Sequence, residues 1–263
     1  MVFLIYGLVF ILGLCFGSFV NMLEYRTAVG YKIKRLPRFA RNDVGGRSFC
    51  DGCGKQLKWY ENIPVISWLI QGGKTRCCRK KLSVSYPIVE LVMGILFLIF
   101  VFIGRPQELP LQFGLGLLII VFLVFSAVFD WKYMILPDFS TGILIICSLI
   151  FIWAIHESPL RNVLAGAGAG AFLGLLYLVT KGRGMGMGDV KLAVFMGLFL
   201  SYPKIILAFY IAFVVGAVVG GFLMLLGRAK KDSQISFGPY LILGTVIAWW
   251  SGDFVINLIN KWW

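Results

Sequence analysis

Two aspartates have the position and spacing of a catalytic pair. Asp130 directly follows the apolar run that ends at Phe129, and Asp189 follows the glycine-rich stretch 184–188 at the start of another apolar run. Ionisable groups at membrane depth are costly and are functional candidates by default. Two such acids can share a proton: one draws a proton from water while the other donates to a peptide carbonyl, as in aspartic proteases.

The chain that carries these acids has the composition of a membrane protein. It has 263 residues, of which 59% are hydrophobic and only 14% are charged, which is too apolar for a soluble domain of this length. Continuous apolar runs near the roughly 20 residues of a bilayer crossing predict an all-α polytopic protein. We predict about eight transmembrane helices, at 2–22, 84–104, 111–129, 139–156, 161–180, 185–202, 204–227 and 238–259.

The basic residues predict the orientation. With the N-terminus outside, the cytoplasmic side receives 23–83, 130–138, 181–184 and 228–237, and only four basic residues stay outside: Arg105, Arg161, Lys204 and Lys261. This asymmetry follows the positive-inside rule and places both acids on the cytoplasmic side. The net charge of +13 therefore indicates contact with anionic lipid headgroups, and we expect no nucleic-acid partner.

Span length places Asp189 below the membrane surface. The apolar stretch from Val190 to Tyr202 is too short to cross alone, so the helix should begin near Gly184, with Asp189 roughly 5–8 Å deep. We expect Gly186 and Gly188 to shape the backbone at this acid and to let a substrate strand approach. A dinucleotide loop is excluded because no strand precedes these glycines.

A third acid, Asp138, has a structural explanation. Pro137 and Asp138 resemble a helix start, with Asp138, Ser140 or Thr141 as the cap. Asp130 has no such role, because a helix C-terminus disfavours an anion.

Elsewhere, glycines four residues apart in 165–171 predict close helix packing.

Two other functions remain open from the residues alone. Intramembrane carboxylates also serve proton or ion pathways in transporters. The chain could also be an inactive, metal-binding scaffold. A serine protease is disfavoured, because the single histidine, His156, falls on the opposite face of the membrane from the acids.

Four cysteines predict a metal site in the cytoplasmic segment 23–83. Cys50 and Cys53 form C-x-x-C, and Cys77 and Cys78 follow as a second pair. Disulfides are disfavoured in the cytoplasm, whereas two cysteine pairs are typical of tetrahedral zinc. Free thiols, or three cysteines with another ligand, are the alternatives. A small domain of this size would gain stability from a metal.

The motifs together resemble those of the bacterial prepilin peptidases (type IV leader peptidases). Gly186-Met187-Gly188-Asp189 matches the G-x-G-D motif of intramembrane aspartic proteases. Three further stretches are similar to family motifs in the same order: Gly17 to Asn21, Trp59 to Trp68, and Ser83 to Glu90. Asp130, which six residues separate from Pro137 and Asp138, resembles the first catalytic motif, and the resemblance covers nearly the whole chain.

The resemblance implies a bifunctional enzyme. It would cleave the leader of type IV prepilins or pseudopilins at the cytoplasmic face, with Asp130 and Asp189 as the dyad, and then methylate the new N-terminus from S-adenosylmethionine. The implied domains are a first transmembrane helix (1–22), a cytoplasmic loop domain associated with zinc and methylation (23–83), and a seven-helix protease domain (84–263).

The chain departs from the family pattern at the cysteines. Two C-x-x-C pairs would place a cysteine at Thr75, with Cys78 in the fourth position and Cys77 between them. Prepilin leaders are themselves basic, so the basic loop would repel them. Acidic residues are the candidates for binding the leader's positive end: Glu24, Glu61, Glu90 and Asp138.

Overall fold

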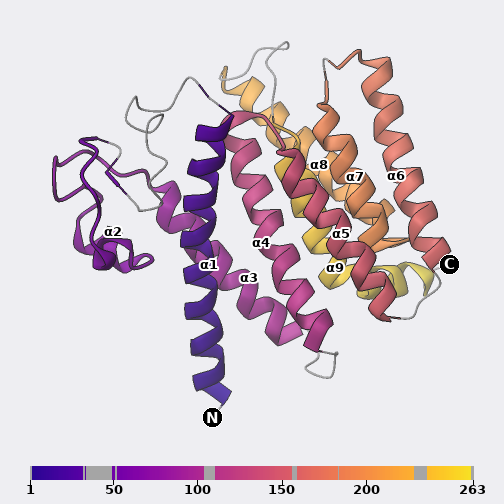
Figure 1. The fold of residues 1–263 in the computed structure, drawn as a ribbon. Helices are drawn as coiled ribbons and strands as arrows, with labels where there is room; N and C mark the ends of the chain where they lie inside the picture. The colour runs from indigo at the N-terminus through magenta and orange to yellow at the C-terminus, as the bar shows by residue number, and fades with distance from the viewer. Residues whose placement is uncertain are drawn as a thin grey trace. The chain divides into compact units, whose positions relative to one another are not determined.

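The computed structural model of the chain describes residues 2–31, 33, 49–50, 52–103, 110–155, 159–182, 184–227 and 236–261. It forms two compact units, Met1–Gln107 and Glu108–Trp263, and Figure 1 labels the helices of the chain. Regular structure in the described parts is helical, with two isolated β-bridges, Phe49–Gln56 and Lys74–Lys81. His156 and much of the basic loop, 34–48, lie outside the described residues.

Unit 1 contains two long helices, α1 (Val2–Gly30) and α3 (Ser85–Ile103), and between them the short η2 (Trp59–Asn62) and α2 (Ile66–Ile70). The long helices pack closely because small residues face the contact. A Cβ atom on Gly17 of α1 would lie 2.5 Å from the Cα atom of Glu90, and one on Gly13 would lie 2.7 Å from that of Gly94.

Helix α1 continues to Gly30, whereas the apolar run predicted an end at 22. Asn21, Glu24 and Ala28 are all buried within the protein. Polar side chains end an apolar pattern, but they do not end a helix when the protein itself covers them.

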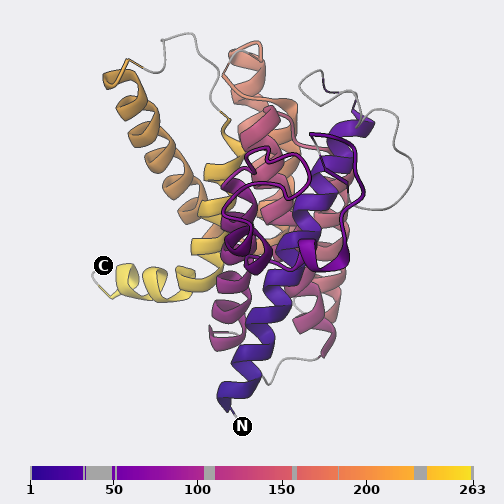
Figure 2. The ribbon, with the colours of Figure 1, turned by 90° about the vertical axis from the view of Figure 1, so that its left-hand side faces the viewer.

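Unit 2 contains α4 (Pro110–Tyr133), α5 (Asp138–Ile155), α6 (Pro159–Val179), α7 (Met187–Leu200), α8 (Lys204–Leu225) and α9 (Gly238–Asn260). Helix α7 packs against α5, α6, α8 and α9, and nearly every residue from Leu192 to Leu200 is buried. It is therefore the central helix of the unit. Figure 2 shows that α9 bends, so that its C-terminal part runs across the direction of its first part.

The predicted all-α polytopic fold is confirmed, and each predicted span corresponds to a helix. Six helices are long and apolar enough to cross a membrane, namely α1, α3, α4, α6, α8 and α9, and the apolar part of α5 is slightly shorter. Helix α7 has 14 residues, about 21 Å at 1.5 Å per residue, and begins at Met187 rather than 185. Because other helices surround α7, its length need not match the bilayer.

The small-residue face of α6 fixes the position of α7. A Cβ atom on Gly166 would lie 2.8 Å from Cγ of Leu198, and one on Gly170 would lie 2.6 Å from Cγ2 of Val194. The predicted close packing through these glycines is confirmed. It sets the central helix whose first turn carries Asp189.

Candidate active site

Asp130 lies in the last turn of α4, and its side chain is 5% exposed. Its Oδ2 atom accepts a hydrogen bond from the Ser236 hydroxyl and a second from the amide of Gly238, at 3.0 Å. Gly238 is the first residue of α9. The unfavourable dipole at the end of α4 is therefore opposed by the N-terminus of α9, where free amides favour an anion.

Asp189 lies in the first turn of α7, and it is 6% exposed. Its Oδ2 atom accepts a hydrogen bond from the amide of Gly186 at 3.0 Å, and its own amide donates to the Gly186 carbonyl at 3.1 Å. The acid thus satisfies an amide that the helix start would otherwise leave unpaired. The backbone of Gly186 is extended, with φ −85°, so its glycine is not needed for a left-handed conformation.

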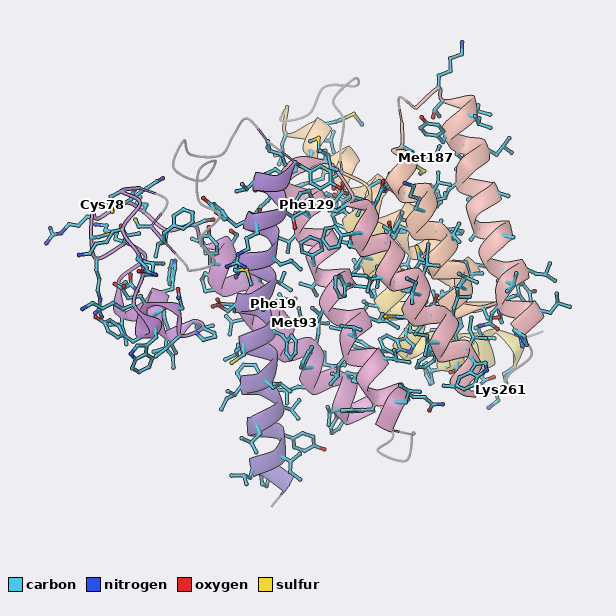
Figure 3. The ribbon with its side chains drawn as sticks, in the orientation of Figure 1. Phe19, Cys78, Met93, Phe129, Met187 and Lys261 are labelled. Atoms are coloured by element: carbon cyan, nitrogen blue, oxygen red, sulfur yellow. The ribbon has the colours of Figure 1, made fainter. Side chains whose placement is uncertain are left out.

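The structure brings the two acids together within unit 2. The two carboxyl groups are close enough for an electrostatic interaction between them. Helices α5 and α9 each pack against α4, which carries Asp130, and against α7, which carries Asp189. These two helices therefore help to fix the positions of the two acids. Figure 3 labels their neighbours Phe129 and Met187, and both lie toward the same end of the unit.

Each carboxyl group has one oxygen that is held and one that is available. The hydrogen bonds among the described residues all go to the Oδ2 atoms. The Oδ1 atoms of Asp130 and Asp189 are therefore the ones left for water or a substrate carbonyl. Two buried acids arranged in this way can divide the roles of general acid and general base.

Gly188 positions Asp189 through close packing. A Cβ atom on Gly188 would lie 2.8 Å from the Cβ atom of Leu136, which precedes α5. The segment between α4 and α5 can therefore lie directly against the start of α7. Any larger residue at 188 would push this segment, and Asp130 before it, away from Asp189.

Asp138 does not cap α5 as the sequence predicted. Its Oδ1 atom pairs with Nζ of Lys191 at 2.6 Å, and the Ser140 and Thr141 hydroxyls donate to carbonyls, those of Pro137 and Asp138. The cap prediction is wrong: α5 begins at Asp138, the Pro137 carbonyl accepts the amides of Ser140 and Thr141, and the Asp138 carboxylate pairs with Lys191 instead. This ion pair bridges α5 and α7 beside the two buried acids.

The sequence analysis missed Ser236 and Gly238. They come to Asp130 from 106 and 108 residues away, so no local pattern links them to it. The one sequence signal is Pro239, since proline just inside a helix start favours such a start at Gly238.

The four loop cysteines come together in unit 1. The Sγ atoms of Cys50, Cys53, Cys77 and Cys78 all lie within 4.8 Å of one another. Two of the distances are 3.3 Å, Cys53 to Cys77, and 3.6 Å, Cys50 to Cys78. Bonds of 2.3 Å to a tetrahedral zinc ion imply sulfur separations of about 3.8 Å. The cluster can therefore hold a metal ion.

Two tight turns supply these sulfurs. The amide of Gly54 donates to the Cys50 carbonyl, and that of Arg79 to the Thr75 carbonyl. Arg79, the residue that closes the second turn, has a positive φ of 52°, so the backbone is irregular directly after Cys77 and Cys78. Thr75 replaces the expected cysteine as a support: its Oγ1 accepts from the Lys80 amide at 3.0 Å and lies 3.2 Å from Cys78 Sγ.

The thiols differ in acidity. Burial disfavours the Cys50 thiolate, but hydrogen bonds from the Gly52 and Cys53 amides outweigh it and lower the pKa of Cys50 to about 6. Hydrogen bonding with Cys53 and Cys50 raises the pKa of Cys77 to about 12. Without metal, the cluster therefore favours the thiolate of Cys50 and disfavours that of Cys77. Neighbouring thiolates repel one another when no cation lies between them.

The other acidic candidates are placed differently. Glu24 and Glu90 are buried in unit 1, at 2% and 7% exposure. Glu61 accepts a hydrogen bond from the Lys58 amide at 2.8 Å. Asp138 is the exposed member of the four acids named for the leader, and it is paired with Lys191, whereas Glu61 is half-buried.

Comparison with known proteins agrees with this arrangement. The bacterial Peptidase A24 N-terminal domain matches residues 11–103, and the type IV leader peptidase family matches residues 117–221. No solved structure matches the chain significantly.

Relatives match along nearly their whole length, and they are named prepilin leader peptidase/N-methyltransferase. The one from Bacillus subtilis is 31% identical over 97% of this chain and 98% of the relative. Those from Neisseria gonorrhoeae and Xanthomonas campestris are 30% and 33% identical, over 96% and 93% of this chain and 92% and 91% of theirs. By its two matched domains and these full-length relatives, the chain belongs to the type IV leader peptidase family.

Proposed function

We propose that this protein is a membrane aspartic endopeptidase that cleaves the leader of prepilins or pseudopilins and then methylates the new N-terminus. The observation that carries the first activity is the pair of buried, interacting carboxyl groups of Asp130 and Asp189. The second activity rests on the names of the full-length relatives.

The pair would hydrolyse the peptide bond without a covalent intermediate. One carboxylate takes a proton from water, whose oxygen attacks the scissile carbonyl carbon, while the other carboxyl group protonates the carbonyl oxygen. The tetrahedral intermediate then collapses: the C–N bond breaks and the leaving nitrogen takes a proton. The bonds to the Oδ2 atoms hold Asp130 and Asp189 in place throughout. Gly186 and Gly188 would let the substrate backbone approach.

A cleavage assay tests the dyad. Asp130→Asn and Asp189→Asn should each abolish processing of a coexpressed prepilin from the same genome, while the protein still accumulates in the membrane. The matched control is Asp253→Asn, which breaks an exposed ion pair with Lys204 in the same unit and should process normally. Normal processing by either dyad variant would refute the proposal.

Zinc and S-adenosylmethionine are the proposed cofactors. The distances between the four sulfur atoms of the cysteine cluster are compatible with a zinc ion. A bound ion would join the two turns that carry the thiols. We assign the cluster to a cytoplasmic loop domain, 23–83, between a first transmembrane helix, 1–22, and a protease domain, 84–263. S-adenosylmethionine would supply the methyl group.

The proposed site is the bacterial plasma membrane, with the N-terminus outside and the acids facing the cytoplasm. Three lysines support this orientation: Lys132 lies in the last turn of α4, Lys181 follows α6, and Lys191 lies near the start of α7. Accessibility of single cysteines introduced at 181 and 204 to an impermeant thiol reagent tests it. Labelling of 204 but not 181 in intact cells is expected, and the reverse would overturn the orientation.

A further inference from the structure

The short helix α2 has an apolar face that the described part of unit 1 leaves open. Ile66, Leu69 and Ile70 are spaced i, i+3 and i+4, which puts them on one side of the helix, and they are 53%, 63% and 69% exposed. Ser67 and Trp68 are half-buried and face the interior of the unit, where they line a cavity. We call the three exposed residues the apolar face of α2. An exposed apolar face on an otherwise polar segment marks an interaction surface.

The surroundings of α2 have the composition of a membrane interface. The sequence has no charged residue from 62 to 73. Trp59, in the short helix η2 that contacts α2, is 79% exposed. Tryptophan is enriched where a protein passes from the apolar core of a bilayer to the headgroups, because its ring is apolar and its N–H is polar.

A hydrogen bond holds α2 at the depth of a membrane-spanning helix. The amide of Val65, which directly precedes α2, donates to Oε2 of Glu90 at 2.7 Å. Glu90 is the sixth residue of α3 and lies within the apolar span Ser85–Phe102. At 1.5 Å per residue it is about 7–8 Å along the helix from its first residue. Figure 1 accordingly shows α2 at the height of α3 rather than beyond its start.

Helix α3 meets lipid at this depth. Ile88 and Leu91, which flank Glu90 within the same turn, are both exposed apolar side chains. Helices that lie in the plane of a bilayer bury their apolar face about 5–10 Å into the boundary between headgroups and acyl chains. The depth of α2 along α3 is therefore that of an interfacial helix.

The charges near α2 favour an anionic lipid surface as the partner. Between residues 52 and 82 there are seven basic residues and one acid, Glu61. Nζ of Lys58 and Cζ of Arg76 lie 5.7 and 5.4 Å from the centre of the Tyr60 ring, which contacts the Trp59 ring edge to face. Lys58 and Arg76, the cation pair, therefore gather beside the exposed indole. Cations near a membrane surface are attracted to anionic headgroups.

We infer that α2 is an interfacial membrane helix. Its apolar face enters the leaflet at the start of α3, Trp59 lies at the headgroup boundary, and the cation pair binds anionic headgroups. A helix of five residues suffices because the membrane-spanning helices α1 and α3 tether the connecting segment at both ends, which makes the contact intramolecular. The inference is independent of the cleavage and methylation activities.

Photocrosslinking of the full-length protein in vesicles identifies what covers α2. Leu69→p-benzoylphenylalanine places a photoreactive group on the apolar face, and the vesicles contain phosphatidylcholine and phosphatidylglycerol in a three-to-one ratio. The matched control is Lys55→p-benzoylphenylalanine, at an exposed position in the first turn of the cysteine cluster. Mass spectrometry should find about fivefold or more lipid adduct at 69 than at 55, because only the first position lies among acyl chains.

The lipids captured at 69 also test the cation pair. Phosphatidylglycerol should be enriched about twofold among the adducts relative to the vesicle, because headgroups near the cations are selected by charge. Lys58→Gln combined with Arg76→Gln should abolish the enrichment, whereas Lys55→Gln should keep it. Adducts that match the composition of the vesicle in the unaltered background would overturn the role of the cation pair.

Other occupants of the apolar face give distinct results. Crosslinks from 69 to unit 2 or to a second copy of the chain, in place of lipid, would show that protein covers α2 and would overturn the inference. Equal lipid adducts at 69 and 55 would overturn it as well. A second measurement leaves α2 unaltered: the fluorescence difference between wild type and Trp59→Phe should be quenched by lipids brominated near the headgroup end of the acyl chains. An unquenched difference would show that Trp59 lies outside the bilayer and contradict the inference.

Discussion

Gly238 at the start of α9 donates its amide proton to Oδ2 of Asp130, near the end of α4, across 3.0 Å. A Cβ atom on this glycine would lie 2.6 Å from the same oxygen, so the site requires the absence of a side chain as well as the presence of the amide. One residue therefore supplies both the hydrogen bond and the space for the carboxyl group.

Gly238→Ala should lower the cleavage rate by about 100-fold or more, because the carboxyl group must shift before the methyl group fits. The comparison is Gly221→Ala in α8, where a Cβ atom meets nothing within 4 Å. Initial rates with purified prepilin in detergent measure both variants. Equal rates for the two would show that α9 does not position Asp130.

Ser236→Ala should have a smaller effect. It removes one donor to Asp130 and leaves the Gly238 amide in place, so kcat should fall about tenfold while KM stays near the wild-type value. Ser236→Thr keeps the hydroxyl and should restore most of the rate. A change in KM alone would indicate that Ser236 contacts the leader peptide instead.

Much of the fold could be predicted from the sequence, and so could the helix end at which each acid lies. Apolar runs located every long helix, because lipid and buried core both demand continuous apolar surface. The alternation of spans then placed Asp130 and Asp189 at the same end of unit 2, where the structure has them interact. Their catalytic roles remain a prediction.

The missed features depend on long-range contacts. The part of α1 beyond residue 22 is covered by protein, as at Glu24 and Ala28, and hydropathy alone does not reveal such cover. Asp138 pairs with Lys191 rather than capping α5, and no local pattern reveals a pair between residues 53 apart. The neighbours Cys77 and Cys78 converge on one cluster in a turn that Arg79 closes with a positive φ, and no spacing rule predicts such a turn.

The cysteine cluster should bind about one zinc ion per chain and lose it as the pH falls. Bound zinc requires thiolates, so acid favours the metal-free, protonated thiols, most steeply below pH 6, where Cys50 itself takes up a proton because its pKa is about 6. Binding at pH 7 should release protons, since the pKa of Cys77 is about 12 without metal. Titrations in buffers of different ionisation enthalpy measure this release.

Cys50→Ser and Cys77→Ser should each abolish stoichiometric zinc, as measured by mass spectrometry of the purified protein. The control is Cys147→Ala in unit 2, which lies outside the cluster. Full zinc content in Cys77→Ser would show that a cysteine triad with another ligand suffices.

The ion pair between Asp138 and Lys191 should matter little for stability. The side chains are 74% and 43% exposed, and exposed pairs contribute about 0.2–1 kcal/mol. Asp138→Asn should therefore lower the unfolding midpoint only slightly and should process prepilin at close to the wild-type rate. Lys191→Met should behave in the same way, and the double variant should be no less stable than the sum of the single changes implies. A folded Asp138→Asn protein that fails to cleave, beside an active Lys191→Met protein, would instead assign the Asp138 carboxylate to the substrate, where it would meet the basic end of the leader.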